Sequence, residues 1–370
     1  MRGGEKVLAA IGEMLPDADI FTHAFGKGMR EEVRGARYEG TRGSWKGHRV
    51  TESFIARLPF GRKHPQAYLP LMPVATRALN LDGYDLIVSS ESGPIKGIRK
   101  PDGARHVCYC HTPMRYLWDM YDEYYRSAGL GGKIAMKAFT ARLRREDLKS
   151  AESVDEFVAN SAFVAARIKR IYGRDSIVVH PPVDVEFFAG KQPVALPAGV
   201  EPKFYYLYAG ELRDYKRPDL AVEACLRMGR KLVVVGNGKM RDRLAKRVGG
   251  SGGIVFLGRV PDEELRSVFT CARALLFPGI EDFGIVPVEA QAVGVPVIAC
   301  NKGGALETVV DGDTGLFFEE GSVSALCSAI ERFESRSWSS EICRKNARRF
   351  SVEAFKSKMS SILGLSWKIG

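Results

Sequence analysis

The second half of the chain alternates short β-rich runs with helical segments, and this alternation constrains the fold more than any other feature. Strands are expected at residues 204–209, 231–235, 254–257, 274–277 and 295–299. The intervening segments are expected to be helical, among them 218–228 and the segment that carries Glu289. Short strands separated by helices form a parallel sheet that is covered on both faces. The second half is therefore predicted to be a doubly wound α/β domain.

The first half is less regular but follows the same pattern. Strands are expected at residues 84–89, 105–110, 155–159 and 176–179. Ser161 stands where a side chain can cap a helix over residues 162–172. A chain of 370 residues is too long for one ordinary domain. The sequence therefore predicts two doubly wound, Rossmann-like domains.

A stiff, proline-containing connection at His180-Pro-Pro-Val-Asp184 marks the junction between these domains. We predict a first domain at residues 1–180 and a second at 181–345, with a cleft between them. Residues 346–370 are expected to form a C-terminal segment that packs back on the first domain, with a helix over Val352–Leu363 and Ser351 as its N-cap.

Two glutamates, Glu281 and Glu289, lie at the two ends of a run that connects a predicted strand to a predicted helix. Glu281 is expected in a loop at the carboxyl end of the strand, and Glu289 a few residues into the helix. In open parallel sheets ligands bind in this crevice, and free N–H groups at a helix start attract phosphate. Acids beside a phosphate site make sense when they hold hydroxyl groups of the same ligand. A sugar nucleotide combines phosphates with hydroxyl-rich rings, so the pattern favours a sugar-nucleotide site.

Composition limits the other classes of function. Hydrophobic residues make up 45% of the chain and charged residues 27%, which is ordinary for a soluble globular enzyme. The sequence shows no apolar run of the roughly 18 residues that a membrane helix needs, and no hydrophobic signal region after Met1. The seven cysteines are scattered without a zinc pattern. These features favour reduced cysteines and a cytoplasmic location.

The formal net charge of +11 suggests nucleic acid, an anionic membrane surface or an anionic substrate as partner. We find no RNA-binding, zinc-finger or basic-zipper signature, so no nucleic-acid partner is expected. Residues 54–77 mix apolar and aromatic residues with Arg and Lys, which suits peripheral contact with a membrane. For the basic segment 137–149, a solvated face over a normal core is at least as good an explanation.

Six segments spread over the whole chain carry a family pattern. They are Gly3-Gly4-Glu5-Lys6, residues 111–118, 180–184 and 209–216, Gly236-Asn-Gly238, and the run from Glu281 to Glu289. Together they resemble the retaining glycosyltransferases of family 4, which have the GT-B fold of two facing Rossmann-like domains. Within that family, residues 111–118 are similar to bacterial GDP-mannose-dependent mannosyltransferases of O-antigen (lipopolysaccharide) and exopolysaccharide biosynthesis. The resemblance implies transfer of mannose from GDP-mannose to a lipid-linked glycan or polysaccharide precursor at the cytoplasmic membrane face.

The resemblance also implies catalytic roles for His111, Lys216 and Glu281. His111 would form a hydrogen bond with the donor sugar at the reaction centre. Lys216 would neutralise the diphosphate as charge builds on the leaving group, and one such charged hydrogen bond contributes about 1.5–3 kcal/mol. Glu281 would accept hydrogen bonds from hydroxyl groups of the transferred sugar. Glu289 would hold the hydroxyl groups of the ribose.

Further donor contacts follow from the same resemblance. They are implied for Gly4, Arg213, Gly236, Asn237, Arg259, Phe283, Gly284, Ile285 and Val286. Gly4 is expected in a glycine loop near the donor phosphates. The residues 283–285 would offer backbone N–H groups to the sugar and phosphate, and Gly284 would let the backbone approach the donor closely. Arg259 lies where relatives contact the base.

Two features depart from the family pattern. The family has arginine directly after the glycine of the 209–216 motif, whereas this chain has Glu211. Arg213 or Arg217 is the alternative for the second phosphate contact, and for each a plain solvent-exposed arginine is an equal interpretation. Relatives also have a hydrophobic strand before the glycine pair. We therefore expect the first strand of the N-terminal domain either to be missing or to lie upstream.

No cluster with metal-ligand spacing is evident, so the reaction is expected to need no metal and no cofactor beyond the nucleotide-sugar substrate. Because Glu281 is assigned to sugar hydroxyls, the sequence offers no convincing carboxylate nucleophile for a double displacement. A same-face substitution is preferred, in which the leaving phosphate helps to deprotonate the acceptor. The alternatives are a UDP-sugar-dependent transferase, a nucleotide-sugar epimerase on the same fold, and a non-catalytic nucleotide-sugar-binding protein.

Overall fold

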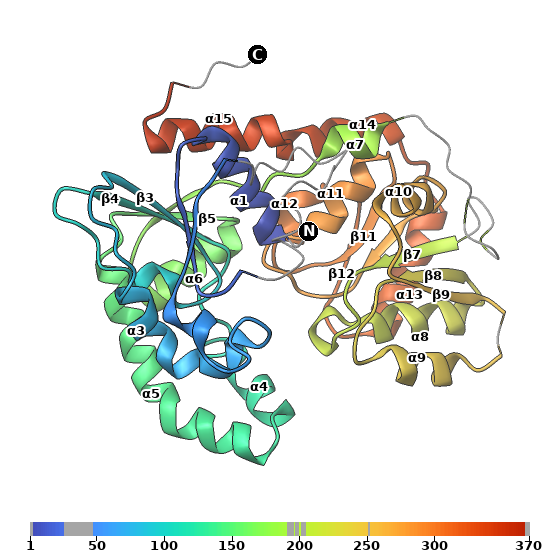
Figure 1. Ribbon diagram of the computed structural model, residues 1–370. Helices are drawn as coiled ribbons and strands as arrows, with labels where there is room; N and C mark the ends of the chain where they lie inside the picture. The colour runs from blue at the N-terminus through green and yellow to red at the C-terminus, as the bar shows by residue number, and fades with distance from the viewer. Residues whose placement is uncertain are drawn as a thin grey trace. The chain divides into compact units, whose positions relative to one another are not determined.

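The computed structural model consists of two compact units (Figure 1). The first contains Met1–His180 together with Lys356–Gly370, and the second contains Pro181–Phe355. The structure describes residues 3–25, 47–190, 196, 200, 205–250 and 252–366. The cleft predicted between the domains stays a prediction.

The second unit is built on a six-stranded parallel sheet in the order β12-β11-β10-β7-β8-β9. The strands are β7 (Tyr205–Ala209), β8 (Lys231–Val235), β9 (Ile254–Gly258), β10 (Leu275–Phe277), β11 (Val297–Cys300) and β12 (Gly315–Phe318). Counted from β7, this is the strand order of Rossmann dinucleotide-binding sheets, which reverses between the first and fourth strands. The reversal here lies between β7 and β10, so a ligand is expected at their carboxyl ends.

Helices cover both faces of this sheet, because successive strand residues point to opposite sides. On β7, Tyr205 and Leu207 enter one core, and Tyr206 and Tyr208 enter the other. The helices are α7 (Val185–Ala189), α8 (Pro218–Met228), α9 (Arg241–Val248), α10 (Asp262–Thr270), α11 (Ile285–Ala292), α12 (Ala305–Thr308), α13 (Val323–Glu334) and α14 (Ser340–Ala347), with short 3-10 turns η4 (Asp214–Lys216) and η5 (Arg348–Phe350). Helices α10 and α11 pack on the first face, and α8, α9 and α13 on the second. Burial on both faces explains why these strands are continuous apolar runs.

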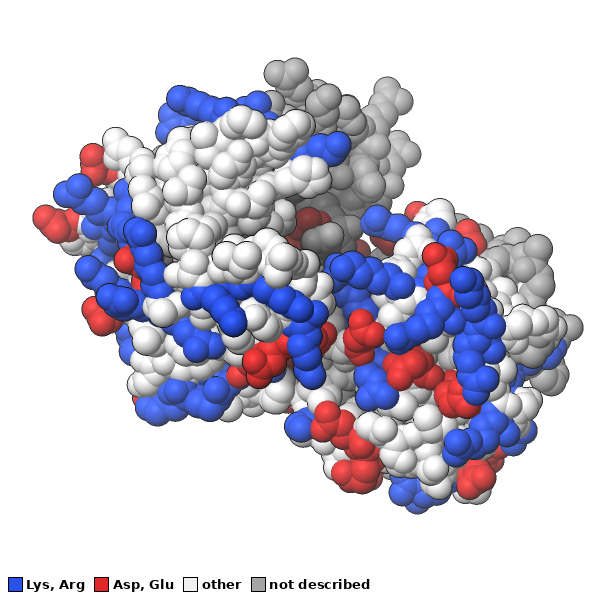
Figure 2. Space-filling view, turned by 90° about the horizontal axis from the view of Figure 1, so that it is seen from below, with Lys and Arg blue, Asp and Glu red and all other residues white. Residues whose placement is uncertain are grey.

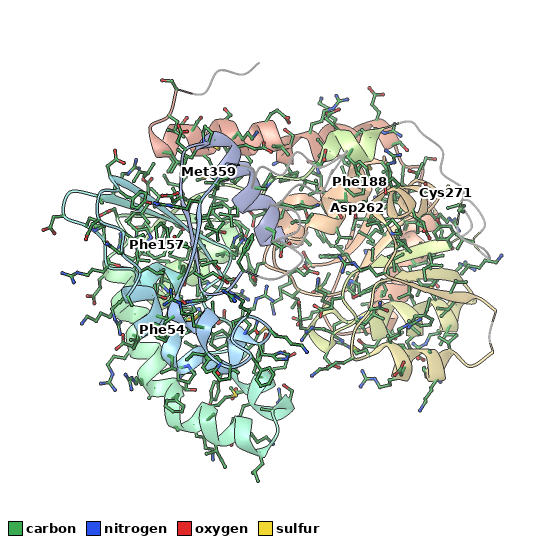
Figure 3. All side chains as sticks on the ribbon, in the orientation of Figure 1. Phe54, Phe157, Phe188, Asp262, Cys271 and Met359 are labelled. Carbon is green, nitrogen blue, oxygen red and sulfur yellow. The ribbon has the colours of Figure 1, made fainter. Side chains whose placement is uncertain are left out.

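The first unit has a four-stranded parallel sheet, β3-β4-β5-β6, and a separate parallel pair, β1-β2. The strands are β1 (Ile20–Thr22), β2 (Val50–Glu52), β3 (Leu86–Glu91), β4 (Arg105–Cys110), β5 (Glu156–Ala159) and β6 (Ser176–Val178). The helices are α1 (Gly3–Met14), α3 (Met72–Arg77), α4 (Tyr121–Ser127), α5 (Leu130–Glu152) and α6 (Ala162–Tyr172), with 3-10 segments η1 (Phe54–Arg57), η2 (Pro65–Leu71) and η3 (Pro94–Gly97). Phe157 lies in the core of this unit and Phe188 in that of the other (Figure 3).

For several elements, the bounds predicted from the sequence are the same as those observed in the structure. Strands β4 and β8 and helices α6 and α8 agree to the residue, and the other predicted strands overlap observed ones. Ser161 caps α6 as predicted, because its Oγ accepts a hydrogen bond of 3.1 Å from the Val164 N–H.

The prediction for the glycine pair Gly3-Gly4 was wrong. The pair does not form a loop but lies in the first turn of α1. Val7, Ile11 and Met14 recur at helical spacing and are buried, so packing of one helix face decides the local structure.

Helix α15 (Val352–Leu363) begins in the second unit and ends in the first. Ser351 caps it, since its Oγ accepts a hydrogen bond of 3.1 Å from Ala354 N–H. Its later residues belong to the first unit, where Met359 is buried and Lys356 forms an ion pair of 2.5 Å with Glu13. Residues 346–355, which the sequence analysis grouped with the C-terminal helix, belong instead to the second unit, where α14 packs on α11.

Candidate functional site

Lys216 and Glu281 face each other at the carboxyl edge of the sheet in the second unit. Lys216 Nζ lies 2.9 Å from Glu281 Oε1, and the two side chains are 16% and 20% exposed. Lys216 ends η4 after β7, and Glu281 lies in the loop after β10, so the pair bridges the two strands where the order reverses. Burial acts to lower the pKa of Lys216, but the charge and hydrogen bond of Glu281, together with Tyr215 and Glu211, outweigh burial and raise that pKa. Lys216 is therefore a cation at neutral pH.

The loops that carry this pair are in close backbone contact with their neighbours. A Cβ atom on Gly279 would lie 2.6 Å from the Cα atom of Lys216. A Cβ atom on Gly304 would lie 2.3 Å from the Cα atom of Phe283. Cβ atoms do not come within 3.0 Å of backbone atoms in folded proteins. The loop after β10 is therefore packed against the loops after β7 and β11 without room for a side chain at either glycine.

The loop after β8 packs on the loop after β7 in the same way. A Cβ atom on Gly236 would lie 1.9 Å from the carbonyl oxygen of Gly210, and Gly236 has a left-handed φ of 125°. Asn237 is exposed, and its Oδ1 would lie 3.6 Å from a Cβ atom on Gly258 at the end of β9. Arg259 follows and is exposed. The structure places Gly236, Asn237 and Arg259 along the edge of the sheet that carries the ion pair.

Gly284 is the N-cap residue directly before helix α11 and has a left-handed conformation with φ 87° and ψ 77°. A Cβ atom there would lie 3.2 Å from the ring of Phe277, so both conformation and space favour glycine. Phe283 precedes it and packs its ring against Phe350 at a centroid distance of 5.5 Å. Ile285 and Val286 then form the first turn. The predicted backbone donors therefore lie at the start of α11, as expected.

Most helix starts at this edge have no side-chain cap. Helices α8, α9, α10, α11 and α12 follow strands β7 to β11, and none has a side-chain cap. Side-chain caps are present on α7, on α13, which follows β12, and on α14 and α15. These are provided by Asp184, Ser322, Ser339 and Ser351. First-turn N–H groups without a side-chain cap are the groups that bind phosphate at such edges.

Glu289 lies in the second turn of α11 and is largely buried, with 7% of its surface exposed. Glu281, in the loop before the helix, has 20% of its side chain exposed. Both acids thus lie on the strand–loop–helix segment where the sequence places them. A contact between Glu289 and a ribose stays a prediction.

The two arginines considered for the second phosphate contact are both paired with carboxylates. Arg213 Nε lies 2.6 Å from Glu211 Oε1, with both side chains about half exposed. An Arg217 guanidinium nitrogen lies 3.0 Å from Asp219, and Arg217 has a left-handed φ of 52°. Exposed ion pairs contribute about 0–1 kcal/mol. Either arginine can therefore exchange its carboxylate for a phosphate at little cost.

His111 directly follows β4 in the first unit. Its Nε2 lies 2.9 Å from Ser90 Oγ, and its backbone N–H donates to the carbonyl oxygen of Glu91 at 2.8 Å. Gly4 comes close to it, since a Cβ atom on Gly4 would lie 3.4 Å from His111 Nε2. The structure thus brings Gly4 and His111 together, although Gly4 reaches this position from a helix.

A second lysine–glutamate pair, which the sequence analysis did not single out, is fully buried in the first unit. Lys96 Nζ lies 2.9 Å from Glu91 Oε1 and also contacts Asp147. Asp147 accepts further hydrogen bonds from Trp118 Nε1 at 2.7 Å and from the Tyr172 hydroxyl at 3.0 Å. Burial acts to lower the pKa of Lys96, but Glu91 and Asp147 raise it well above its usual value. The network joins the segment 111–118 to β3, α5 and α6.

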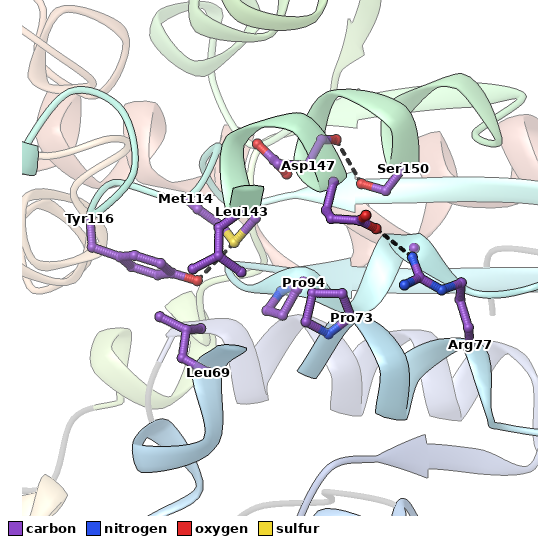
Figure 4. A pocket seen from close by; sticks show the side chains of 11 residues that line it. Leu69, Pro73, Arg77, Pro94, Met114, Tyr116, Leu143, Asp147 and Ser150 are labelled. Carbon is purple, nitrogen blue, oxygen red and sulfur yellow. Dashed lines mark hydrogen bonds and ion pairs between the residues drawn. The ribbon is translucent and has the colours of Figure 1, made fainter. Parts of the chain in front are cut away.

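Asp147 also lies beside a narrow cavity in the first unit (Figure 4). Pro73, Pro94 and Leu143 form part of its apolar wall. Arg77 and Glu146, which form an ion pair of 2.6 Å, also line the cavity. No sequence motif marks this cavity, because its lining comes from segments far apart in the chain.

Among the residues that the structure describes, no group of three or more His, Cys, Asp or Glu is arranged to hold a metal ion. Residues 17–19 and 311–313 have the Asp-x-Asp spacing found in metal-dependent transferases. Asp19, however, is engaged by Arg49, and Asp311 accepts a hydrogen bond of 3.2 Å from the Phe317 N–H. Metal independence stays a prediction.

Models of two families match the chain. Residues 1–187 match the model described as Glycosyltransferase Family 4, and residues 197–350 match the one described as Glycosyl transferases group 1. A D-inositol 3-phosphate glycosyltransferase of Kribbella flavida is 33% identical over 214 residues, which cover 51% of this chain and 50% of that protein. A second, from Catenulispora acidiphila, is 31% identical over 203 residues, covering 48% and 47%. The matched part of this chain thus spans about half the length of each of these curated relatives.

Solved structures resemble the whole chain, and two of them illustrate the match. The HepE protein of Anabaena, solved in complex with UDP, has a TM-score of 0.68 at 18% identity, covering 98% of this chain and 96% of that one. Sucrose-phosphate synthase from Thermosynechococcus elongatus has a TM-score of 0.66 at 21% identity, covering 95% and 90%. At these identities the likeness concerns the fold.

Proposed function

Because the chain belongs to the family 4 glycosyltransferases and has the GT-B fold, we propose that it transfers a sugar from a nucleotide-sugar donor to a glycan or lipid-linked acceptor, with retention of configuration. The observation that carries the proposal is the pair of Lys216 and Glu281 at the reversal of strand order. A cation and a carboxylate within 2.9 Å of each other match a ligand that presents phosphate beside hydroxyl groups.

In the proposed mechanism the donor takes over both members of the pair. Lys216 turns from Glu281 to the diphosphate and stabilises the charge that grows on the leaving group. Glu281 accepts hydrogen bonds from the hydroxyls of the sugar, and the first turn of α11 adds N–H groups. The acceptor then attacks on the face that the diphosphate leaves, and the leaving phosphate takes the acceptor proton. No carboxylate of the chain acts as nucleophile in this scheme.

For the donor we propose GDP-mannose, which is supported by the resemblance of residues 111–118. A UDP-sugar is the second candidate, because the structure of HepE that resembles this chain contains UDP. A thermal-shift panel with GDP-mannose, GDP, UDP-glucose and UDP separates the two, since a tightly bound donor stabilises the folded state. Stabilisation by the uridine compounds alone would replace the first donor by the second.

The site itself is tested by Lys216→Ala and Glu281→Ala. Loss of one preorganised charged contact lowers transfer about 10²–10³-fold. Sugar transfer to an acceptor is measured at saturating donor, and circular dichroism checks that both variants are folded. Unchanged turnover in both variants would remove the site. His111→Ala tests the contact with the donor sugar in the same assay, against wild type.

Three other outcomes identify different functions. Product that forms without an acceptor, as an epimerised nucleotide sugar, indicates an epimerase on this fold. Nucleotide-sugar binding in calorimetry without turnover of any acceptor indicates a binding protein. Binding to DNA that weakens steeply with salt would instead indicate a nucleic-acid partner. On the face drawn in Figure 2, Lys and Arg side chains lie among acidic and uncharged ones.

We propose that the acceptor is lipid-linked and that residues 54–77 of the first unit contact an anionic membrane surface. Phe60 is 78% exposed and has a left-handed φ of 56°, which is costly for a bulky residue. Phe54, Leu71 and Val74 are also exposed, and so are Arg57, Arg62 and Lys63. Exposed apolar groups beside cations match an anionic lipid surface. None of the helices described in the structure is both long and apolar enough to cross a membrane.

Vesicle flotation tests this surface. The protein is expected to float with vesicles that contain phosphatidylglycerol, less with pure phosphatidylcholine, and less as salt is raised. Phe60→Asp should weaken flotation. Ile342→Asp in the second unit replaces an apolar residue that is 45% exposed, and it should leave flotation unchanged. Equal flotation of both variants would remove residues 54–77 from the contact.

A further inference from the structure

Three loops at the carboxyl edge of the second unit are stacked through glycines around the proposed donor site. Gly279, after β10, touches the backbone of Lys216, after β7. Gly304, after β11, touches the backbone of Phe283, and its N–H donates a hydrogen bond of 2.8 Å to the carbonyl oxygen of Glu281. The strands β11, β10 and β7 are neighbours in the sheet, so each contact joins one loop to the next.

Neither of these glycines is required by its backbone conformation. Gly304 has φ −66° and ψ −15°, which any residue adopts, and the φ of Gly279 lies outside the left-handed range. What excludes a side chain at each position is the distance to the facing backbone, 2.6 Å and 2.3 Å from a Cβ atom. The property that glycine supplies here is therefore the spacing between loops.

We propose that Gly279 and Gly304 are positioning residues, which set where Lys216 and the Glu281–Phe283 loop meet the donor; this inference rests on the proposed function. An alanine at either position would push the facing backbone away by several tenths of an ångström or more. Because charged contacts to a transition state depend on such placement, a displacement of about 1 Å lowers rates on the order of 10²-fold.

A double-mutant cycle between Gly279 and Lys216 tests the proposal. The dissociation constant of GDP or UDP, whichever the wild type binds more tightly, is measured by calorimetry for the wild type, Gly279→Ala, Lys216→Ala and the double variant. Alanine at residue 216 keeps the backbone that Gly279 touches but removes the amine. Gly279→Ala is expected to weaken binding at least tenfold when Lys216 is present, and less than twofold when it is absent.

Two glycine variants serve as matched controls in the second unit. A Cβ atom on Gly315 would lie 1.9 Å from the carbonyl oxygen of Val297. Both residues begin their strands, β12 and β11, so this contact lies at the amino edge of the sheet, away from the proposed donor site. Gly315→Ala should therefore destabilise the fold while leaving nucleotide affinity within twofold. Gly250 has open space around its Cβ position, and Gly250→Ala reports the effect of the bare substitution.

The results of these measurements distinguish failure of the positioning role from failure of the proposed function. A wild type that binds neither GDP nor UDP overturns both. A wild type that binds, with equal weakening by Gly279→Ala in both backgrounds or with no weakening, overturns only the positioning role. If Gly279→Ala does not fold, the cycle is repeated with Gly304→Ala and Glu281→Ala, read out by affinity for the nucleotide sugar. Failure of both glycine variants to fold, while Gly315→Ala folds, overturns the proposal too.

Discussion

Each unit holds a lysine–glutamate pair near the carboxyl ends of its parallel strands, and the two pairs have the same length but opposite surroundings. Lys96–Glu91 and Lys216–Glu281 both measure 2.9 Å. The first pair has no exposed surface, whereas the side chains of the second are 16% and 20% exposed. The first is completed by Asp147, and the second is the proposed donor site. Surroundings, and not distance, distinguish a structural ion pair from one that can exchange partners.

The largest effect is expected from removing the buried lysine. Lys96→Met leaves Glu91 and Asp147 buried without their cation, and breaking such a pair costs about 3–5 kcal/mol. Lys216→Met leaves a single carboxylate, Glu281, whose side chain is 20% exposed, and should cost less than Lys96→Met. Urea denaturation measures both. Similar losses in the two variants would break the distinction between the pairs.

The pH dependence of stability should come in part from a buried histidine in the first unit. Burial lowers the pKa of His106, on β4, from 6.5 to about 4. A folded-state pKa below the unfolded value favours neutral imidazole, so this stability is complete above pH 6.5 and is lost as the pH falls toward about 4. The shift corresponds to about 3 kcal/mol.

His106→Gln is the variant that isolates this effect. Between pH 6.5 and 4 it should lose about 3 kcal/mol less stability than the wild type. Urea denaturation at both pH values measures the difference. A matched change at an exposed histidine, His64→Gln, reports the effect of the bare substitution.

The open pair should show its exchangeable character in nucleotide binding. Glu281→Gln removes the carboxylate that competes with a diphosphate for Lys216, so GDP or UDP without a sugar should bind up to about tenfold more tightly. Sugar transfer should fall in the same variant. Calorimetry gives the affinity, and Glu223→Gln, which removes a carboxylate paired with Arg247 on α9, is the control. Weaker nucleotide binding in Glu281→Gln would contradict the exchange.

The smallest effect concerns the helix starts of the two units. Ser161→Ala removes the cap of α6 in the first unit and should cost about 1 kcal/mol. Nucleotide affinity should not change, because Lys216 and Glu281 of the proposed donor site belong to the second unit. Thermal denaturation and calorimetry on one preparation measure both quantities.

Local patterns carried most of the fold of the second unit. Its strands are buried on both faces and are bounded by glycines and helices, so residues 231–235 and 218–228 could be delimited from sequence alone. The loop assigned to Gly3-Gly4 failed, because apolar residues further along α1 decide that structure by tertiary packing.

The site was predictable only where motifs are continuous. Glu281 and the first turn of α11 follow from one run of sequence, and Lys216 from another. The buried network around Lys96 was missed, since its partners Asp147 and Tyr172 are brought together only by folding. The glycine contacts escaped for the same reason, because spacing between loops is a property of neighbouring strands.

The passage of α15 from one unit to the other bears on how this protein can be recombined with its relatives. The first unit is assembled from two stretches of chain, and the buried Met359 and the ion pair of Lys356 with Glu13 belong to it. A chimera joined only near residue 180 would bring in the last helix turns of a foreign protein and would leave Glu13 facing an unmatched residue. Exchange of donor specificity between family members should therefore use two crossover points, one before Pro181 and one after Phe355.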